Sequence, residues 1–491
     1  MKDMTWWHSI KKIGKDHPAA LWISAIALLL FTSISLVNHY FFRTYSFDLG
    51  LFNQAMYDYR SFRFSDTGTF TYTQDNFLAD HFDLYLIIFS PLSYLLGSST
   101  LLWVQIFSLL LGSWGVYRFV RNKQADLALP AMIGFLSFYG IYTALAFDYH
   151  SNVVAAASVP WFFLSMQQRK FTAALAWFLW ILAGKETMAL WMGVVVVCMA
   201  WEYRKDKKAL QWLGLFWFLA VVWFLVIHGW VLPSLNSQGY AHFKYKILGE
   251  TPLEALQTLI TQPGEVFSHF LHNHTGAAEG HGIKEETQKL LLLSGAWLLV
   301  FRPAYLGMLV PLVFMKFFHN ETKTWSICYH YSIEFAPILA IGGFSVLSGL
   351  KQPVWRRVLG WFVVASTMVA TGLSMAENKF YCGEERHRFY TAKHWHAPYD
   401  IGALKEGLSS IPSGARVSAN APLVPRLAFR DHIYCYPIVK DAEYVVFSLG
   451  LPPYPLTWEE NIAHCKKYYS DTGWELSFVN KEIRIFRRKG N

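Results

Sequence analysis

Long apolar runs alternate with short polar segments along the chain up to about residue 376. A helix that crosses a bilayer needs about 20 apolar residues. Several runs are shorter than this, and 171–184 with 187–201 fits one broken helix as well as two. The pattern still predicts an all-α polytopic membrane protein with about eleven transmembrane helices, at 19–42, 100–120, 128–147, 151–166, 171–184, 187–201, 209–231, 289–301, 304–318, 331–349 and 355–375.

The basic residues predict the orientation, because Lys and Arg concentrate in cytoplasmic loops. With eleven spans, every basic cluster falls on the side of the N-terminus, from Lys11, Lys12 and Lys15 to Lys351, Arg356 and Arg357. The apolar segment 82–97 is short for a span, and counting it would move the cluster at 118–123 outside. We therefore interpret it as an interfacial or re-entrant helix. The N-terminus is then cytoplasmic and the C-terminus extracytoplasmic.

Two long outer loops follow from this orientation, at 43–99 and 232–288, with an amphipathic helix expected near 252–262. From about residue 377 the apolar runs shorten, while Pro, Gly and charged residues become more frequent. Here the pattern predicts a helix at 400–411 and strands in AEYVVFSL and ELSFVNKEIRIFRR. It also predicts a strand, a turn and a short helix in ARVSANAPLVPRLA. We expect a transmembrane domain at 1–376 and a small extracytoplasmic α/β domain at 377–491.

Composition agrees with a membrane protein. Hydrophobic residues make up 54% of the chain and charged residues only 16%, against about 25% charged in soluble domains. The net charge of +9 does not indicate nucleic-acid binding, since the basic residues lie in clusters between apolar runs. The lipid bilayer is the expected partner. A disulfide can form among Cys382, Cys435 and Cys465, but sequence spacing does not fix its pairing.

Five polar motifs interrupt or flank the apolar sequence, and the predicted orientation places all of them at the outer membrane face. They are FDLG (47–50), DHFD (80–83), FDYH (147–150), GKE (184–186) and YHYSIEF (329–335). Ionisable groups at membrane depth are costly and usually mark function. Asp48, directly after the first span, could take a proton from an acceptor hydroxyl or hold a metal. The alternative is a loop carboxylate that faces water.

Two other motifs add candidate residues for binding a substrate or a cation. Asp80, His81 and Asp83 could bind a divalent cation (Mg or Mn) together with Asp48, or could simply cap the interfacial helix. Asp148 and His150 lie between two spans, where a turn would place them over a cavity or form an ordinary polar connection.

The last two motifs contain cations suited to a phosphate. Lys185 lies between two apolar stretches and could bind phosphate as a point charge, with Glu186 as its partner or as a second acid. The alternative is an internal ion pair that fixes helix packing. His330 and Glu334 are four residues apart on one helix face, next to Tyr331, and could contact a phosphate or a metal.

In this order the motifs resemble an uncharacterised family of predicted bacterial membrane proteins that is similar to the GT-C superfamily of membrane glycosyltransferases. That superfamily includes protein mannosyltransferases and aminoarabinose transferases of lipid A. The resemblance covers most of the chain, including the tail motifs IPSGARVSANAPLVPRLAFRDHIYCYP and DAEYVVFSL.

The resemblance implies an inverting transfer of a sugar from a polyprenyl-phosphate donor to a cell-envelope acceptor, at the outer face of the bacterial cytoplasmic membrane. Asp48 would be the catalytic carboxylate, the DHFD segment would be the neighbouring acidic helix, and Lys185 or His330 would meet the lipid phosphate. The chain departs from better-known members because Leu49 and Gly50 follow Asp48, so no adjacent acidic pair is present. Metal dependence is therefore open.

Two other functions fit the same residues. A transporter or flippase of a lipid-linked or ionic substrate would use the buried Asp, Lys and Glu as a proton relay. A non-catalytic envelope scaffold would recruit partners through its tail. The gathering of charges at one face and the lack of an internal repeat favour the transferase. Lys185 and Glu186, between two short apolar runs, fit a transporter better.

Overall fold

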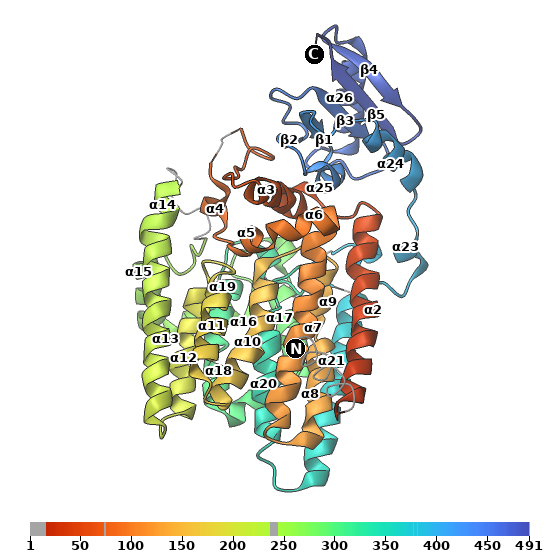
Figure 1. Cartoon of the computed structure of the whole chain (residues 1–491). Helices are drawn as coiled ribbons and strands as arrows, with labels where there is room; N and C mark the ends of the chain where they lie inside the picture. The colour runs from red at the N-terminus through yellow and green to blue at the C-terminus, as the bar shows by residue number, and fades with distance from the viewer. Residues whose placement is uncertain (1–15, 73–74, 236–243, 377, 381, 491) are drawn as a thin grey trace, which may run out of the picture.

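The computed structural model describes residues 16–72, 75–235, 244–376, 378–380 and 382–490. In Figure 1 the helices run side by side in one bundle, and a small sheet domain lies at one end of it. The prediction of a mainly helical chain with a small C-terminal α/β domain is confirmed.

Four helical stretches of the described chain are long and apolar enough to cross a membrane: Pro18–Tyr40, Tyr85–Arg121, Lys207–Leu235 and Pro353–Ala376. They contain α2 (Pro18–Tyr40), α7 (Thr100–Arg121), α13 (Lys207–Val226) and α21 (Pro353–Ala376). A fifth candidate span combines α8 (Ala128–Leu136) and α9 (Tyr139–Leu145), with a bend of 41° between its halves. Membrane-spanning capacity is therefore present in the chain.

Shorter helices occupy the other predicted spans. They are α10 (Ser151–Gln167), α11 (Phe171–Leu182), α12 (Met188–Glu202), α17 (Ile283–Leu293), α18 (Pro303–Gly307), α19 (Val310–Phe317) and α20 (Phe335–Leu347). The helices α11 and α12 are separate and pack against each other. Because these helices are shorter than the usual span, the count of eleven stays a prediction.

Close packing of α7 on α10 depends on a glycine. A Cβ atom at Gly112 would lie 2.6 Å from the backbone oxygen of Ala157, closer than atoms can approach. Small residues at such crossings let helix backbones come together, as in membrane bundles generally. The helices α7 and α10 therefore pack closely against each other within the bundle.

The predicted first outer loop is largely helical. It contains α3 (Leu51–Arg60), α4 (Phe77–Asp80), α5 (Tyr85–Phe89) and α6 (Ser93–Leu96), and α5 packs against α3. Gly97 has a positive φ of 55° and separates α6 from the turn before α7. In Figure 1 α3, α5 and α6 lie at the end of the bundle that carries the sheet domain. An interfacial role for 82–97 stays a prediction, because Tyr85–Arg121 as a whole is apolar enough to span.

The predicted second outer loop also contains helices. The amphipathic helix expected near 252–262 is confirmed as α15 (Pro252–Thr261), which Thr251 caps by accepting a hydrogen bond from the amide of Glu254. The short α14 (Leu232–Leu235) precedes it, and α16 (Pro263–Leu271) follows and packs against both α17 and α19. The second outer loop therefore packs against the helical bundle through the contacts of α16 with α17 and α19.

Arg43 ties the end of α2 to the segment that leads into the C-terminal domain. Its guanidinium donates hydrogen bonds to the backbone oxygens of Glu385 (2.9 Å), Lys393 (3.0 Å), His394 (2.7 Å) and His396 (2.8 Å). The short helices of this segment, α22 (Glu384–His387) and α23 (Ala392–Trp395), contact α2. The linking segment thus packs on the helical bundle, and the division after residue 376 stays a prediction.

The disulfide that the sequence left possible among Cys382, Cys435 and Cys465 is not formed. Cys382 pairs with Cys328, which precedes α20, with 5.9 Å between their Cα atoms. Cys435 and Cys465 are buried and free. The sequence did not reveal this pair because the two cysteines lie 54 residues apart, with α20 and α21 between them.

The C-terminal domain contains a five-stranded sheet of order β2-β1-β3-β5-β4. Its strands are β1 (Val417–Ala419), β2 (Ile433–Cys435), β3 (Tyr444–Ser448), β4 (Trp474–Val479) and β5 (Ile483–Arg488). β1 is parallel to β2 and β3, whereas β5 is antiparallel to β3 and β4. The predicted helix at 400–411 and the three predicted strand segments are confirmed, with α24 (Ile401–Ser409), α25 (Val424–Leu427) and α26 (Trp458–Ser470) as the helices.

Candidate functional site

Asp48 lies in a wide helical turn, η1 (Ser46–Gly50), between α2 and α3. The buried carboxylate of Asp148 holds this turn. One of its oxygens, Oδ2, accepts hydrogen bonds from the amides of Tyr45 (3.0 Å) and Leu49 (3.3 Å). These amides begin a helical segment and would otherwise have no acceptor. Asp148 therefore positions Asp48, and its other oxygen has no hydrogen-bond partner among the described residues.

His150 connects Asp48 to the bundle. Its Nε2 lies 3.2 Å from Oδ1 of Asp48, and its backbone amide donates to Oε1 of Gln105 at 3.0 Å. Its ring stacks on the ring of His330, with centroids 3.5 Å apart. Burial and the nearby His150 lower the pKa of His330. The pair therefore carries at most one positive charge, and the carboxylate of Asp48 favours that charge on His150.

A cavity of about 350 Å³ opens beside this pair, and we name it the lysine cavity. The predicted residues that line it are Asp48, His81, His150, Lys185, Glu186, His330 and Tyr331. They come from all five motifs, which are far apart in the sequence. Glu334, also singled out in the sequence, lines the cavity as well. The cavity thus gathers most of the predicted site residues.

Lys185 lies in the turn between α11 and α12. Its ammonium forms no hydrogen bond or ion pair with any described residue, although it faces a cavity. Glu186 points elsewhere: it accepts a hydrogen bond from the amide of Phe82 at 3.3 Å and lies 3.9 Å from Nδ1 of His81. Burial opposes ionisation of Glu186, but His81 and Lys185 together hold its pKa below the ordinary value. In the structure Glu186 therefore interacts with His81, and Lys185 stays available for an anion.

Three lysines of the cavity were not recognised in the sequence. Lys316 on α19 pairs with Glu334 at 2.9 Å, and Lys244 and Lys323 both pair with Glu321, at 2.6 and 2.7 Å. Lys316 carried a usable signal, because it is a charged residue inside a predicted span. Lys244 and Lys323 carried none, since lysines are ordinary in outer loops.

Asp80 and Asp83 do not line the lysine cavity. Asp83 is buried, and its Oδ1 accepts a hydrogen bond from the amide of Tyr85, the first residue of α5, at 2.9 Å. The side chain of Asp80 is partly exposed and lies 3.9 Å from His81. Within the described ranges, no group of three or more His, Cys, Asp or Glu residues is arranged to hold a metal ion. The divalent cation at Asp48, Asp80 and Asp83 stays a prediction without structural support.

A second cavity, of about 580 Å³, meets the first at Asp48. We name it the aromatic cavity, because its lining includes Tyr45, Phe47, Phe147, Tyr329, Tyr331 and Tyr454. Tyr454 comes from the C-terminal domain and packs edge-on against Phe47, with ring centroids 5.4 Å apart. Asp48, His150, Lys323, His330 and Tyr331 line both cavities. Asp48 therefore lies between a cationic space and an aromatic one.

Comparison with known proteins gives the family. Residues 38–449 match the family described as "Predicted membrane protein (DUF2079)". The chain belongs to this family. Its match begins at the end of α2 and includes the lining of the lysine cavity, the lining of the aromatic cavity apart from Tyr454, and the strands β1, β2 and β3. No curated protein matches the sequence significantly.

Solved structures show which fold the DUF2079 chain shares. It is similar to ArnT from Cupriavidus metallidurans bound to undecaprenyl phosphate, with 12% identity and a TM-score of 0.53, over 96% of this chain and 98% of that one. The apo state of the same ArnT covers the same shares, at 13% identity and a TM-score of 0.48. At this identity the likeness concerns the fold alone. The resemblance to the GT-C superfamily is thereby confirmed at the level of fold.

Proposed function

We propose that this protein is a membrane glycosyltransferase that moves a sugar from a polyprenyl-phosphate donor to a cell-envelope acceptor at the outer face of the cytoplasmic membrane. The observation that carries the proposal is the position of Asp48 between the lysine cavity and the aromatic cavity. A transferase must bring an anionic donor and a hydroxyl acceptor to one base, and these two cavities meet at one carboxylate.

The lysine cavity suits the donor phosphate. Lys185 supplies a cation with no partner among the described residues, and Lys316, Lys244 and Lys323 surround it. Lysine binds phosphate as a point charge. The structural relative ArnT was crystallised with undecaprenyl phosphate, which supports a lipid-linked phosphate as the partner. The aromatic cavity would then receive the acceptor.

The chemistry follows from this placement. An acceptor hydroxyl in the aromatic cavity gives its proton to the Asp48 carboxylate as its oxygen attacks the anomeric carbon of the donor sugar. The bond from that carbon to the phosphate oxygen breaks, and the polyprenyl phosphate leaves with the electron pair. Lys185 stabilises the developing charge on the leaving phosphate, while His150 orients Asp48. A single displacement of this kind inverts the anomeric centre.

The test uses the full chain purified into proteoliposomes with a panel of labelled polyprenyl-phosphate sugars and an envelope-lipid extract as acceptor. We expect transfer of label from at least one donor and release of free polyprenyl phosphate. Movement of the intact donor across the bilayer without release would instead support a flippase that uses the same charges. No release and no movement with any donor, in a preparation that binds undecaprenyl phosphate, would overturn the proposal.

A further inference from the structure

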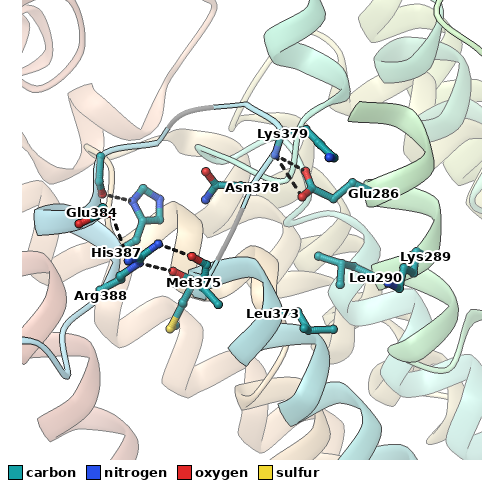
Figure 2. A pocket seen from close by; sticks show the side chains of 12 residues that line it. Glu286, Lys289, Leu290, Leu373, Met375, Asn378, Lys379, Glu384, His387 and Arg388 are labelled. Carbon is teal, nitrogen blue, oxygen red and sulfur yellow. Dashed lines mark hydrogen bonds and ion pairs between the residues drawn. The ribbon is translucent and has the colours of Figure 1, made fainter. Parts of the chain in front are cut away.

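A third cavity, of about 660 Å³, lies where α17, the end of α21 and the linking segment meet. Figure 2 shows this space, which we name the linker cavity. Its polar lining comprises Glu286, Lys289, Asn378, Lys379, Glu384, His387 and Arg388. The short helix α22 separates it from the aromatic cavity: Glu385 and Arg386 face the aromatic side, and Glu384 and His387 face this one.

The linker cavity has one apolar and one polar end. In Figure 2 Leu290, Leu373 and Met375 lie together on one side, and Asn378, Lys379 and Glu286 lie on the other. Leu373 is 43% exposed and belongs to α21, which is long and apolar enough to span a membrane. A leucine so exposed on a spanning helix contacts lipid. The cavity therefore lies at the end of a span, where acyl chains give way to head groups.

Two lysines that line the cavity are available for an anion: Lys379 lies at the polar end, and Lys289 lies beside Leu290 (Figure 2). The ammonium groups of Lys289 and Lys379 form no hydrogen bond or ion pair with the residues the structure describes. Arg388 is already engaged, because it pairs with Glu384 at 3.1 Å and donates to the backbone oxygen of Met375 at 2.7 Å. The two free cations thus lie on different parts of the cavity wall, one at its polar end and one beside its apolar side chains.

His387 adds a buried acceptor. Its side chain is nearly fully buried, and its Nδ1 lies 3.2 Å from the backbone oxygen of Gly383. A carbonyl only accepts, so Nδ1 carries the hydrogen and Nε2 is a bare acceptor. Nε2 has no partner among the described residues, and Figure 2 shows the ring at the edge of the cavity, between Glu384 and Asn378. Burial, with the charge of Arg386, lowers the pKa of His387 to about 4, so the ring stays neutral and calls for a donor.

From these contacts we infer that the linker cavity binds a glycerophospholipid head group that carries both a phosphate and an N–H or O–H donor. Lys289 and Lys379 hold the phosphate, the donor group reaches Nε2 of His387, and an acyl chain follows Leu290 and Leu373. A lipid bound there contacts α22, and residues of α22 also line the aromatic cavity. This site is independent of the proposed transfer reaction.

The test is native mass spectrometry of the purified full chain with phosphatidylethanolamine, phosphatidylcholine and inorganic phosphate. The two lipids share a phosphate and a zwitterionic charge, but only phosphatidylethanolamine has N–H donors. We expect it to bind about fivefold more tightly, the value of one hydrogen bond to a buried acceptor. Lys289→Gln with Lys379→Gln should weaken both lipids about tenfold. The matched control is Lys246→Gln with Lys405→Gln, two exposed lysines that do not line the linker cavity, and it should change the binding of neither lipid.

His387→Phe should abolish the preference for phosphatidylethanolamine while phosphatidylcholine binds as before. If that variant fails to fold, the lysine pair still decides, since both side chains are exposed and unbonded to the described residues. Lipid binding that is unchanged in Lys289→Gln with Lys379→Gln would overturn the inference. Full displacement of the lipid by inorganic phosphate at equal concentration would also overturn it, by showing a small-anion site.

Discussion

His150 and Asp48 form a hydrogen-bonding pair with 3.2 Å between Nε2 and Oδ1, at the junction of two cavities of opposite character. The pair is built from two connections that lie about a hundred residues apart, and Asp148 holds the turn on which Asp48 lies. The lysine cavity on one side offers cations, and the aromatic cavity on the other offers rings. The functional proposal rests on this junction.

Asp148 should matter for the shape of the site. Asp148→Asn replaces an acceptor of two backbone hydrogen bonds with an amide that also carries buried donors, which costs about 1–3 kcal/mol. We expect a lower apparent melting temperature of the detergent-purified protein. Asp75→Asn, a partly exposed carboxylate of the first outer loop, is the control and should melt as the wild type does. Equal melting of all three proteins would contradict the positioning role.

Lys185 and Lys316, two of the lysines that line the lysine cavity, should behave differently when substituted. Lys185→Met removes a cation without a partner among the described residues, so we expect about tenfold weaker binding of undecaprenyl phosphate with little change in stability. Lys316→Met leaves Glu334 buried without its 2.9 Å partner and should lower stability by about 3–5 kcal/mol. The measurements are native mass spectrometry for binding and thermal unfolding for stability.

A double variant separates these effects. Lys316→Met with Glu334→Gln removes the whole buried pair and should recover most of the lost stability, because no charge is left buried alone. If Lys185→Met destabilised the protein as much as Lys316→Met, Lys185 would have a structural partner that the account does not include.

Asp83 should make stability depend on pH. Burial raises the pKa of Asp83 to about 8, with the charge of Lys185 acting in the opposite direction, from an ordinary value of 3.8. Between these two values the folded protein holds a proton that the unfolded chain has released. Stability is therefore full below about pH 4 and falls as the pH rises toward 8, by up to about 1.4 kcal/mol per pH unit.

Thermal unfolding from pH 5 to pH 8 measures this contribution. Asp83→Asn keeps a neutral side chain at all these pH values, so its melting temperature should fall less than that of the wild type. Parallel curves for the two proteins would show that Asp83 is already ionised in the folded state.

The Cys328–Cys382 disulfide should stabilise the linking segment. It closes a loop of 54 residues, and Cys328→Ser should lower stability by about 2–4 kcal/mol. Peptide mapping without reduction should give a Cys328–Cys382 peptide, while Cys435 and Cys465 react with a thiol reagent only after denaturation. A peptide that joins Cys382 to Cys435 would contradict the pairing.

The sequence predicts the helical bundle, the sheet domain and eight of the residues that line the lysine cavity, because charged residues inside or beside apolar runs are rare and conspicuous. Lys185 and His330 were found in this way. The role of Asp83 was not decided, since a capping carboxylate and a metal-binding carboxylate both precede a helix. Lys316 was missed although it is a charged residue inside a predicted span, and only the fold shows that it pairs with Glu334. The aromatic cavity was not foreseen, because Tyr454 reaches Phe47 from a separate domain.

The most direct test of the central claim is the rate at which Asp48→Asn releases polyprenyl phosphate from the sugar donor that the wild type uses. Asn keeps the size of the side chain but takes no proton, so the rate should fall about 10²–10⁴-fold. The Asp48→Asn protein should still bind undecaprenyl phosphate. The control Asp75→Asn should release polyprenyl phosphate from the sugar donor at the wild-type rate. An Asp48→Asn protein that keeps the wild-type rate would contradict the assignment of Asp48 as the base and, with it, the proposed transfer site.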